Sequence, residues 1–278
     1  MKIILSRKGF DSAAGGIPSP ILPDGTLLSL PIPSHSKTSF RTVKFKGISL
    51  ETLLTHLDGR IRVGARWKAV DGSRSCHLDP DLGLYETPRG TTWKPAMGQA
   101  GAAASHLRRN AIGTGDVFLF FGWFKQVRAH GLYWEYDLQA PDIHVFFGYL
   151  EVGQVVVPPP WPQPVAYHPH TENHFAGNPT NIIFMATDRL TWDKKLPGAG
   201  TFKYCDIVQL TKPGHTRSQW NLPECLRRVS ITYHSPSSWH DGYFQAAARG
   251  QEFVITADVE VEEWGSSLIR QGIKGTPT

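Results

Sequence analysis

The segment from residue 115 to residue 157 constrains the fold most, because it is rich in aromatic and β-branched residues and is divided by turn-forming residues. Gly115-Asp116 is a typical turn, and the residues after it predict four strands, at 117–124, 131–136, 143–150 and 152–157. Gly148 and Gly153 interrupt the last two strands and predict bulges or bends there. Successive strands with short connections form a β-meander, so we expect β-sheet at the centre of the molecule.

The alternation and the glycine placement of this meander are similar to the central pattern of pseudouridine-synthase-and-archaeosine-transglycosylase-like barrels, several of which hold a modified or flipped nucleobase. That likeness implies a barrel-like meander. Helical patterns occur at 49–57, where Ser49 is the expected N-cap, and at 98–110. Asp258 is the expected cap of a final helix, although Val259 and Val261 alternate as they would in a strand. We therefore predict an α+β fold that is rich in β-structure, with a barrel-like meander at its centre and helices packed around it.

A proline-rich stretch at 158–162 is stiff and is the best candidate for a boundary between two lobes. It would separate an N-terminal lobe, residues 1–157, from a C-terminal lobe, residues 158–278, packed on it. A chain of 278 residues can equally form one single domain, and the sequence leaves both arrangements open.

Positive charge is concentrated near the N-terminus. Residues 1–75 contain 12 lysines or arginines and 5 aspartates or glutamates, whereas the remaining residues contain 17 and 19. This asymmetry favours a polyanionic or phosphorylated partner, so we expect the partner to be a nucleotide or DNA.

The three cysteines are scattered and form no Cys-x-x-Cys pair, which argues against a disulfide framework and against a zinc site of that type. The first apolar run is too short for a signal peptide, and no apolar segment approaches the length that spans a bilayer. We expect a reduced, cytoplasmic protein with no membrane partner. The cofactor and the oligomeric state stay open.

A glycine-rich loop follows the short apolar strand that begins the chain. Its glycines allow backbone N–H groups to approach a ligand closely. Arg7 and Lys8 supply charge for a phosphate or a carboxylate, and Asp11 and Ser12 add polar groups. The loop is therefore a candidate binding site. The alternative is an ordinary turn that leads to a second strand at 26–30.

Polar residues alternate in His77-Leu78-Asp79-Pro80-Asp81. Alternate side chains of an extended segment face the same side, so His77, Asp79 and Asp81 can form an acid–base or metal site. Pro80 favours the extended shape because it restricts the preceding residue. The alternative is an ordinary turn in which an aspartate caps backbone amides.

The helix expected at 98–110 places Gln99 and His106 near one face, because they are seven residues apart. They either point into a pocket or are a hydrogen-bonded glutamine and a surface histidine. Trp123 and Phe124 lie in the first strand of the meander and offer flat surfaces on which a base can stack. The alternative for these aromatic residues is the hydrophobic core.

Three histidines follow the proline-rich stretch, at positions 168, 170 and 174. Histidines at such spacings can bind a metal ion, but without a supporting carboxylate or cysteine pattern they are more often hydrogen-bonding or surface groups. We therefore predict no metal site and keep His168 and His170 as alternative ligands. Further along, Gln251 and Glu252 either close over the pocket or form an exposed polar turn.

Several runs are typical of one family. They are Ser6-Arg7-Lys8-Gly9-Phe10-Asp11-Ser12, Pro18-Ser19-Pro20-Ile21, His77-Leu78-Asp79-Pro80-Asp81-Leu82, Gly98-Gln99-Ala100-Gly101, Gly115 to Phe124 and His168-Pro169-His170. In these runs the chain resembles the nucleotide modification associated domain 3 family over nearly its whole length. The resemblance implies an association with enzymes that modify DNA bases, but no particular reaction.

No complete catalytic signature is present: the chain has no Walker loop, nucleophile elbow, dinucleotide-binding glycine triplet or zinc-deaminase pattern. Our first hypothesis is an enzyme that acts on a modified nucleotide or on a base in DNA. In it, Arg7 and Lys8 hold phosphate, Asp11 or Asp79 is the general base, and His77 transfers protons. Asp81 completes this catalytic set.

Two other hypotheses remain. A reader would bind a modified base without changing it, by stacking and through its basic surface. A metal-dependent nuclease would use His77, Asp79 and Asp81 with the His168 and His170 pair. Several carboxylates would weaken the binding of nucleic acid by a protein that only reads bases, because each carboxylate repels the phosphates. The number of carboxylates therefore favours the enzyme.

Overall fold

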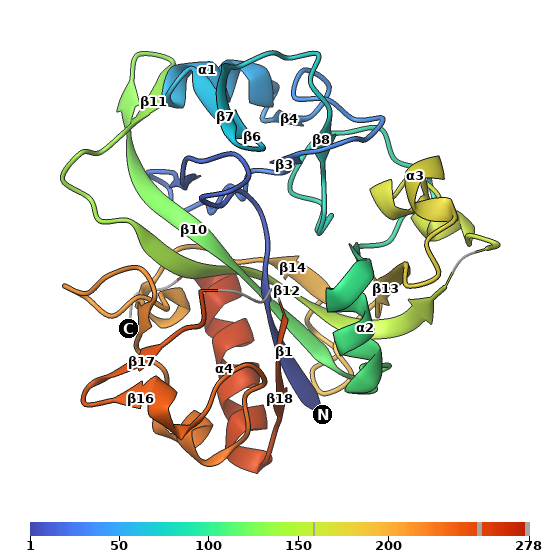
Figure 1. Cartoon of the computed structure of the whole chain (residues 1–278), viewed down its shortest axis with the longest axis vertical. Coiled ribbons are helices and arrows are strands. Elements are labelled where there is room, and N and C mark those ends of the chain that lie inside the picture. The colour runs from blue at the N-terminus through green and yellow to red at the C-terminus, as the bar shows by residue number, and fades with distance from the viewer. Residues whose placement is uncertain (158, 249–251, 276–278) are drawn as a thin grey trace.

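A nine-stranded mixed sheet is the largest feature of the computed structural model, which describes residues 1–157, 159–248 and 252–275 (Figure 1). Its main path runs β18-β1-β10-β12-β13-β9, with β2 and β11 also paired to β10 and β14 paired to β12. The strands are β1 (Lys2–Arg7), β2 (Ser19–Ile21), β9 (Ala96–Gln99), β10 (Val117–His130), β11 (Tyr133–Tyr136), β12 (Ile143–Val156), β13 (Ile182–Ala186), β14 (Ala199–Thr201) and β18 (Glu252–Thr256).

Strand β1 lies inside this sheet. It pairs in parallel with β10, where Arg7 faces Phe121, and antiparallel with β18, where Ser6 faces Glu252. Ile3, Ile4 and Leu5 are completely buried, so both faces of β1 are covered, as is usual for a strand in parallel pairing. The first and the last strands of the described chain are therefore neighbours in the sheet.

The strands expected at 117–124, 131–136 and 143–150 are confirmed as β10, β11 and β12. The separate strand expected at 152–157 is wrong, because β12 continues to Val156. The pairing of β12 shifts register opposite Phe120 and Phe121 and again between Val152 and Gln154, which leaves Gly153 as an extra residue. Bulges of this kind bend a strand without ending it.

Within the described residues the sheet is open, so the barrel-like closure that we expected is wrong. The long strands β10 and β12 change partners along their length: β10 pairs first with β1 and then with β2, and β12 pairs with β14 and then with β13. The two outer strands of the path, β18 and β9, do not pair with each other through their backbones. The fold is nevertheless a mixture of α and β structure that is rich in sheet, as expected.

The described residues form four α-helices beside the sheet: α1 (Leu50–Leu57), α2 (Gly101–Arg109), α3 (Asn173–Ala176) and α4 (Val259–Lys274). The two expected caps are present, since Ser49 accepts a hydrogen bond from Thr52 N and Asp258 accepts one from Val261 N. Helix α4 packs on the sheet so closely that a Cβ atom on Gly265 would lie 2.7 Å from Ile3 Cδ1 (Figure 1). No helix in the described ranges is long and apolar enough to span a membrane.

Short elements complete the chain. The strands are β3 (Ile32–Pro33), β4 (Lys44–Phe45), β5 (Ile48–Ser49), β6 (Arg60–Val63), β7 (Arg66–Ala69), β8 (Cys76–His77), β15 (Gln219–Trp220), β16 (Trp239–His240) and β17 (Tyr243–Gln245). The 3-10 helices are η1 (Gln163–Val165), η2 (Pro169–Thr171), η3 (Asp206–Val208), η4 (Glu224–Arg228) and η5 (Pro236–Ser238). The strand expected at 26–30 is wrong, because this segment makes only isolated bridges.

The larger hydrophobic cluster surrounds the main sheet and contains residues from both parts of the chain, such as Phe120 and Phe253. A second cluster forms around α1 and includes Phe10 and Phe40. The lobe boundary after residue 157 stays a prediction, and Pro158 itself lies outside the described residues.

The cap of α4 yields a stability prediction. Asp258→Ala removes the acceptor of the Val261 N–H group, which is 3.0 Å from Asp258 Oδ1. The free energy of unfolding should fall by about 1 kcal/mol, measured by urea unfolding. Asp258→Asn keeps an oxygen that can accept the same bond and should lose less. Equal losses in the two variants would contradict a capping role.

Candidate functional site

The end of β1 sends two neighbouring basic side chains to opposite sides, because successive residues of a strand face opposite ways. Arg7 donates hydrogen bonds to the carbonyl oxygens of Ala247 and Ala248, at 2.9 and 3.2 Å. Lys8 Nζ lies 3.0 Å from Asp79 Oδ2 on the other side. The single pocket expected from the sequence is therefore divided into two sites.

The first site, which we call the histidine cluster, consists of Lys8, His77, Asp79, His168 and His170. His77 ends the short strand β8, while His168 is the N-cap of η2 and His170 lies within η2. Asp79 is their common neighbour. Its Oδ1 atom accepts a hydrogen bond from Gly98 N at 2.7 Å and lies 3.3 Å from His168 Nε2.

The charge of Asp79 is stabilised inside the protein. Burial opposes ionisation of this carboxyl group, but Lys8 and His168 outweigh burial and hold the pKa of Asp79 well below its usual value. The side chain of Lys8 is itself only 9% exposed. Lys8 and Asp79 are therefore a buried ion pair, in which each charge depends on the other.

Two histidines of the cluster, His77 and His170, are neutral at neutral pH. Burial lowers the pKa of His77 to about 4 and that of His170 to about 3, although the nearby Asp79 acts in the opposite direction. Close packing keeps them near Asp79, since a Cβ atom on Gly98 would lie 2.2 Å from His170 Cδ2. The cluster thus combines one carboxylate with neutral imidazoles.

The donor atoms of His77, Asp79 and His170 all lie within 4.8 Å of one another, which is close enough to hold one metal ion. His170 was among the alternative ligands named from the sequence, but His168 is not part of this group. Asp81 points elsewhere, because it forms a bidentate pair with Arg89 at 2.7 and 2.8 Å. The alternation along residues 77–81 thus brings together His77 and Asp79 without Asp81.

Gln99 lies beside the histidine cluster but on strand β9, so the expectation that it shares a helix face with His106 is wrong. Gln99 Nε2 donates to Glu252 Oε1 at 2.7 Å, and this oxygen is 3.9 Å from Lys8 Nζ. Glu252 is buried, which raises its pKa, and Gln251 lies outside the described residues. His106 is on α2, with its Nε2 3.1 Å from Thr232 Oγ1.

The second site is a cavity of about 490 Å³, which we call the arginine cavity. Six side chains that line it are Arg7, Asp11, Ser12, Trp123, His144 and Arg217. The guanidinium group of Arg217 lies 4.1 Å from the centre of the Trp123 ring and donates a hydrogen bond to Ser12 Oγ at 3.0 Å. Asp11 Oδ1 accepts from the backbone N–H groups of residues 13 and 14, both at 2.7 Å.

This cavity carries more positive than negative charge. Burial, with the proximity of Arg217, lowers the pKa of Arg7, while Asp11 acts in the opposite direction. His144 Nδ1 accepts a hydrogen bond from Trp220 Nε1 at 3.0 Å, so the proton of this imidazole is on Nε2. Burial and the two arginines hold the pKa of His144 well below its usual value. Two cations and one carboxylate therefore share the cavity with a neutral histidine.

His144 and Arg217 were not expected from the sequence. His144 lies within an aromatic strand, and Arg217 lies in a loop without a motif. Of the two aromatic residues that were expected to stack a base, only Trp123 lines the cavity. Phe124 is completely buried on the opposite face of β10, which assigns it to the core.

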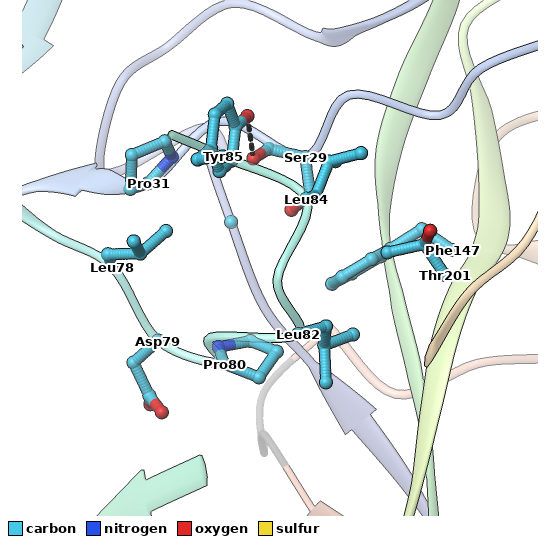
Figure 2. Close-up of a pocket in the computed structure, with 11 residues that line it drawn as sticks. Ser29, Pro31, Leu78, Asp79, Pro80, Leu82, Leu84, Tyr85, Phe147 and Thr201 are labelled. Atoms are coloured by element: carbon cyan, nitrogen blue, oxygen red, sulfur yellow. Dashed lines mark hydrogen bonds between the residues drawn. The ribbon is translucent and has the colours of Figure 1, made fainter. Parts of the chain in front are cut away.

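A third pocket beside Asp79 is too small for a substrate, since it holds about 20 Å³. Figure 2 shows that its walls are mostly apolar and that the carboxylate of Asp79 points away from them. Tyr85 closes one end through a hydrogen bond from its hydroxyl to the Ser29 carbonyl, at 2.6 Å. This pocket therefore adds no binding site.

Comparison with known proteins gives one match. A family model described as nucleotide modification associated domain 3 matches residues 2–256 of the chain. No curated protein and no solved structure matches it. The matched segment contains every residue of both sites.

The buried ion pair yields a stability prediction. Lys8→Met leaves the Asp79 carboxylate buried without its cation, so the free energy of unfolding should fall by about 3 kcal/mol or more in the presence of EDTA. Adding Asp79→Asn removes the uncompensated charge and should restore part of the loss. Lys194→Met, at an exposed position, is the control, and a loss as large as that of Lys8→Met would contradict the prediction.

Proposed function

Because this chain belongs to the nucleotide modification associated domain 3 family, we propose that it binds a modified nucleotide or a modified base of DNA in the arginine cavity and processes it there. One observation carries the proposal: two guanidinium groups share a cavity with a single carboxylate. Such an arrangement favours an anionic ligand, and guanidinium groups bind phosphate with paired hydrogen bonds.

Both arginines keep hydrogen-bonding capacity for a phosphate. Arg217 makes one hydrogen bond to a side chain among the described residues, to Ser12 Oγ, out of five N–H groups. Arg7 donates to two carbonyl oxygens, and its Nε atom is buried without a partner in the described part of the chain. The cavity volume of about 490 Å³ is within the usual range for small-molecule sites.

The groups beside the arginines suit a base and its chemistry. Trp123 supplies an aromatic edge, and His144 Nε2 carries a proton that it can donate to a ring or exocyclic atom. Asp11 is held by two backbone N–H groups through Oδ1, while its Oδ2 has no hydrogen bond within the described residues. We assign Asp11 the role of general base on this ground.

The alternative function is a non-catalytic reader of modified bases. It is favoured by the fact that Asp11 Oδ1 also stabilises its own loop, as a purely structural aspartate would. In addition, His77 and Asp79 lie in the histidine cluster and do not line the arginine cavity. A reader would need only Arg7, Arg217 and the aromatic side chain.

The binding step is tested by Arg217→Met. Loss of a charge-assisted hydrogen bond should weaken binding of short DNA duplexes with hypermodified pyrimidines, or of the matching nucleotides, by at least about tenfold. Fluorescence anisotropy and calorimetry measure these affinities. Arg189→Met removes an exposed arginine that does not line the cavity and should bind as the wild type does. Equal affinities for both variants would contradict the assigned site.

The chemical step is tested by the intact mass of the same duplexes before and after incubation, with and without divalent metal. We expect a change in mass that Asp11→Asn abolishes while binding is retained. If the protein selectively retains a modified duplex but its mass does not change, the catalytic proposal is wrong and the non-catalytic reader is supported. If neither the duplexes nor the nucleotides are retained by the wild type, the proposed function is wrong.

A further inference from the structure

We propose that the histidine cluster is a binding site for a divalent transition metal ion, held by His77, Asp79 and His170. The donor atoms of these three side chains lie within 4.8 Å of one another. Two imidazoles with one carboxylate are the ligand types that Zn²⁺ and Fe²⁺ bind in proteins. This site is separate from the arginine cavity and does not rest on the proposed function.

The hydrogen bonds of Asn181 prepare His170 as a ligand. Asn181 Nδ2 donates to the His170 carbonyl oxygen at 2.8 Å, so Asn181 Oδ1 is the acceptor that faces the imidazole. His170 Nδ1 is 2.7 Å from this oxygen and must carry the proton. The lone pair of the ring is therefore on Nε2. A second partner that fixes the tautomer in this way is usual for histidines that bind metal ions.

His77 supplies an independent sign of a missing partner. Its side chain is 8% exposed, and its Nδ1 atom is buried without a hydrogen bond in the described part of the chain. An unpaired polar atom in such a place is costly unless a ligand satisfies it. The ring packs edge-on to His170 with their centres 5.1 Å apart, which directs the two imidazoles to a common space.

Asp79 retains the capacity to bind a cation. Each carboxylate oxygen has two lone pairs. Oδ1 faces both Gly98 N, at 2.7 Å, and His168 Nε2, at 3.3 Å, whereas Oδ2 uses one lone pair for Lys8 Nζ and keeps the other for a cation. These donors hold the carboxylate in place, as outer partners do in metal sites. The Lys8 ammonium would repel a metal ion, but its charge is offset by the Asp79 carboxylate, 3.0 Å away.

His168 does not join the ligand set, although it lies in the same cluster. Its Nδ1 atom accepts the His170 backbone N–H at 3.3 Å, so its own proton is on Nε2, 3.3 Å from Asp79 Oδ1. Three protein ligands leave at least one position of the metal open, as in catalytic sites. The ion would thus be able to bind water or a substrate group.

The test uses the full chain, stripped with EDTA and titrated with Co²⁺, whose visible absorption reports nitrogen and oxygen ligands. We expect a single bound ion, displaced by Zn²⁺. His170→Ala should weaken Co²⁺ binding by at least about tenfold, the smallest loss usual even for an outer partner. His174→Ala, an exposed histidine on α3, is the matched control and should bind like the wild type.

A second measurement keeps the test valid if the variants unfold. Ions that bind only the folded state raise the midpoint of thermal unfolding, so Zn²⁺ should raise it for the wild-type chain and not for His77→Ala. No Co²⁺ absorption and no Zn²⁺ shift in the wild type would overturn the proposal. Equal Co²⁺ affinity in His170→Ala and His174→Ala would also overturn it.

Discussion

The pairing of β1 on both of its edges is the constraint on which both sites depend. Parallel pairing with β10 and antiparallel pairing with β18 fix the direction in which each side chain of β1 points. Arg7 is thereby directed to the arginine cavity and Lys8 to the histidine cluster. A shift of one residue in this register would exchange the two sides, so sheet geometry, more than the loop that follows, determines which charge reaches which site.

Burial of charge determines the rest of the histidine cluster. A carboxylate without a cation cannot remain ionised inside a protein, and the ion pair between Lys8 and Asp79 meets this requirement. The backbone of Gly98 satisfies both partners: its N–H group donates to Asp79, and its carbonyl oxygen accepts from Lys8. The same arrangement presents histidines in their neutral form, which is the form that binds metal ions.

Sequence patterns predicted the local structure well where one element decides it. Strand periodicity located β10 to β12, and capping residues located the starts of α1 and α4. The helix expected at 98–110 wrongly included Gln99. Gly98 and Gln99 instead pair with Ile183 and Ile182 of β13, and this tertiary pairing overrides helix propensity. Likewise, Arg217 lies in a loop far from Ser12 in the sequence but donates a hydrogen bond to it, and no residue spacing in the sequence indicates this contact.

Helix α4 lies beyond the segment that matches the family model, yet its packing is part of the central sheet. The matched segment ends at residue 256, whereas α4 begins at Val259 and covers Ile3 of β1 through Gly265. Without this helix, an apolar face of the strand that carries both sites would be open to water. The hydrophobic core of the main sheet therefore extends one helix beyond the segment that matches the family model.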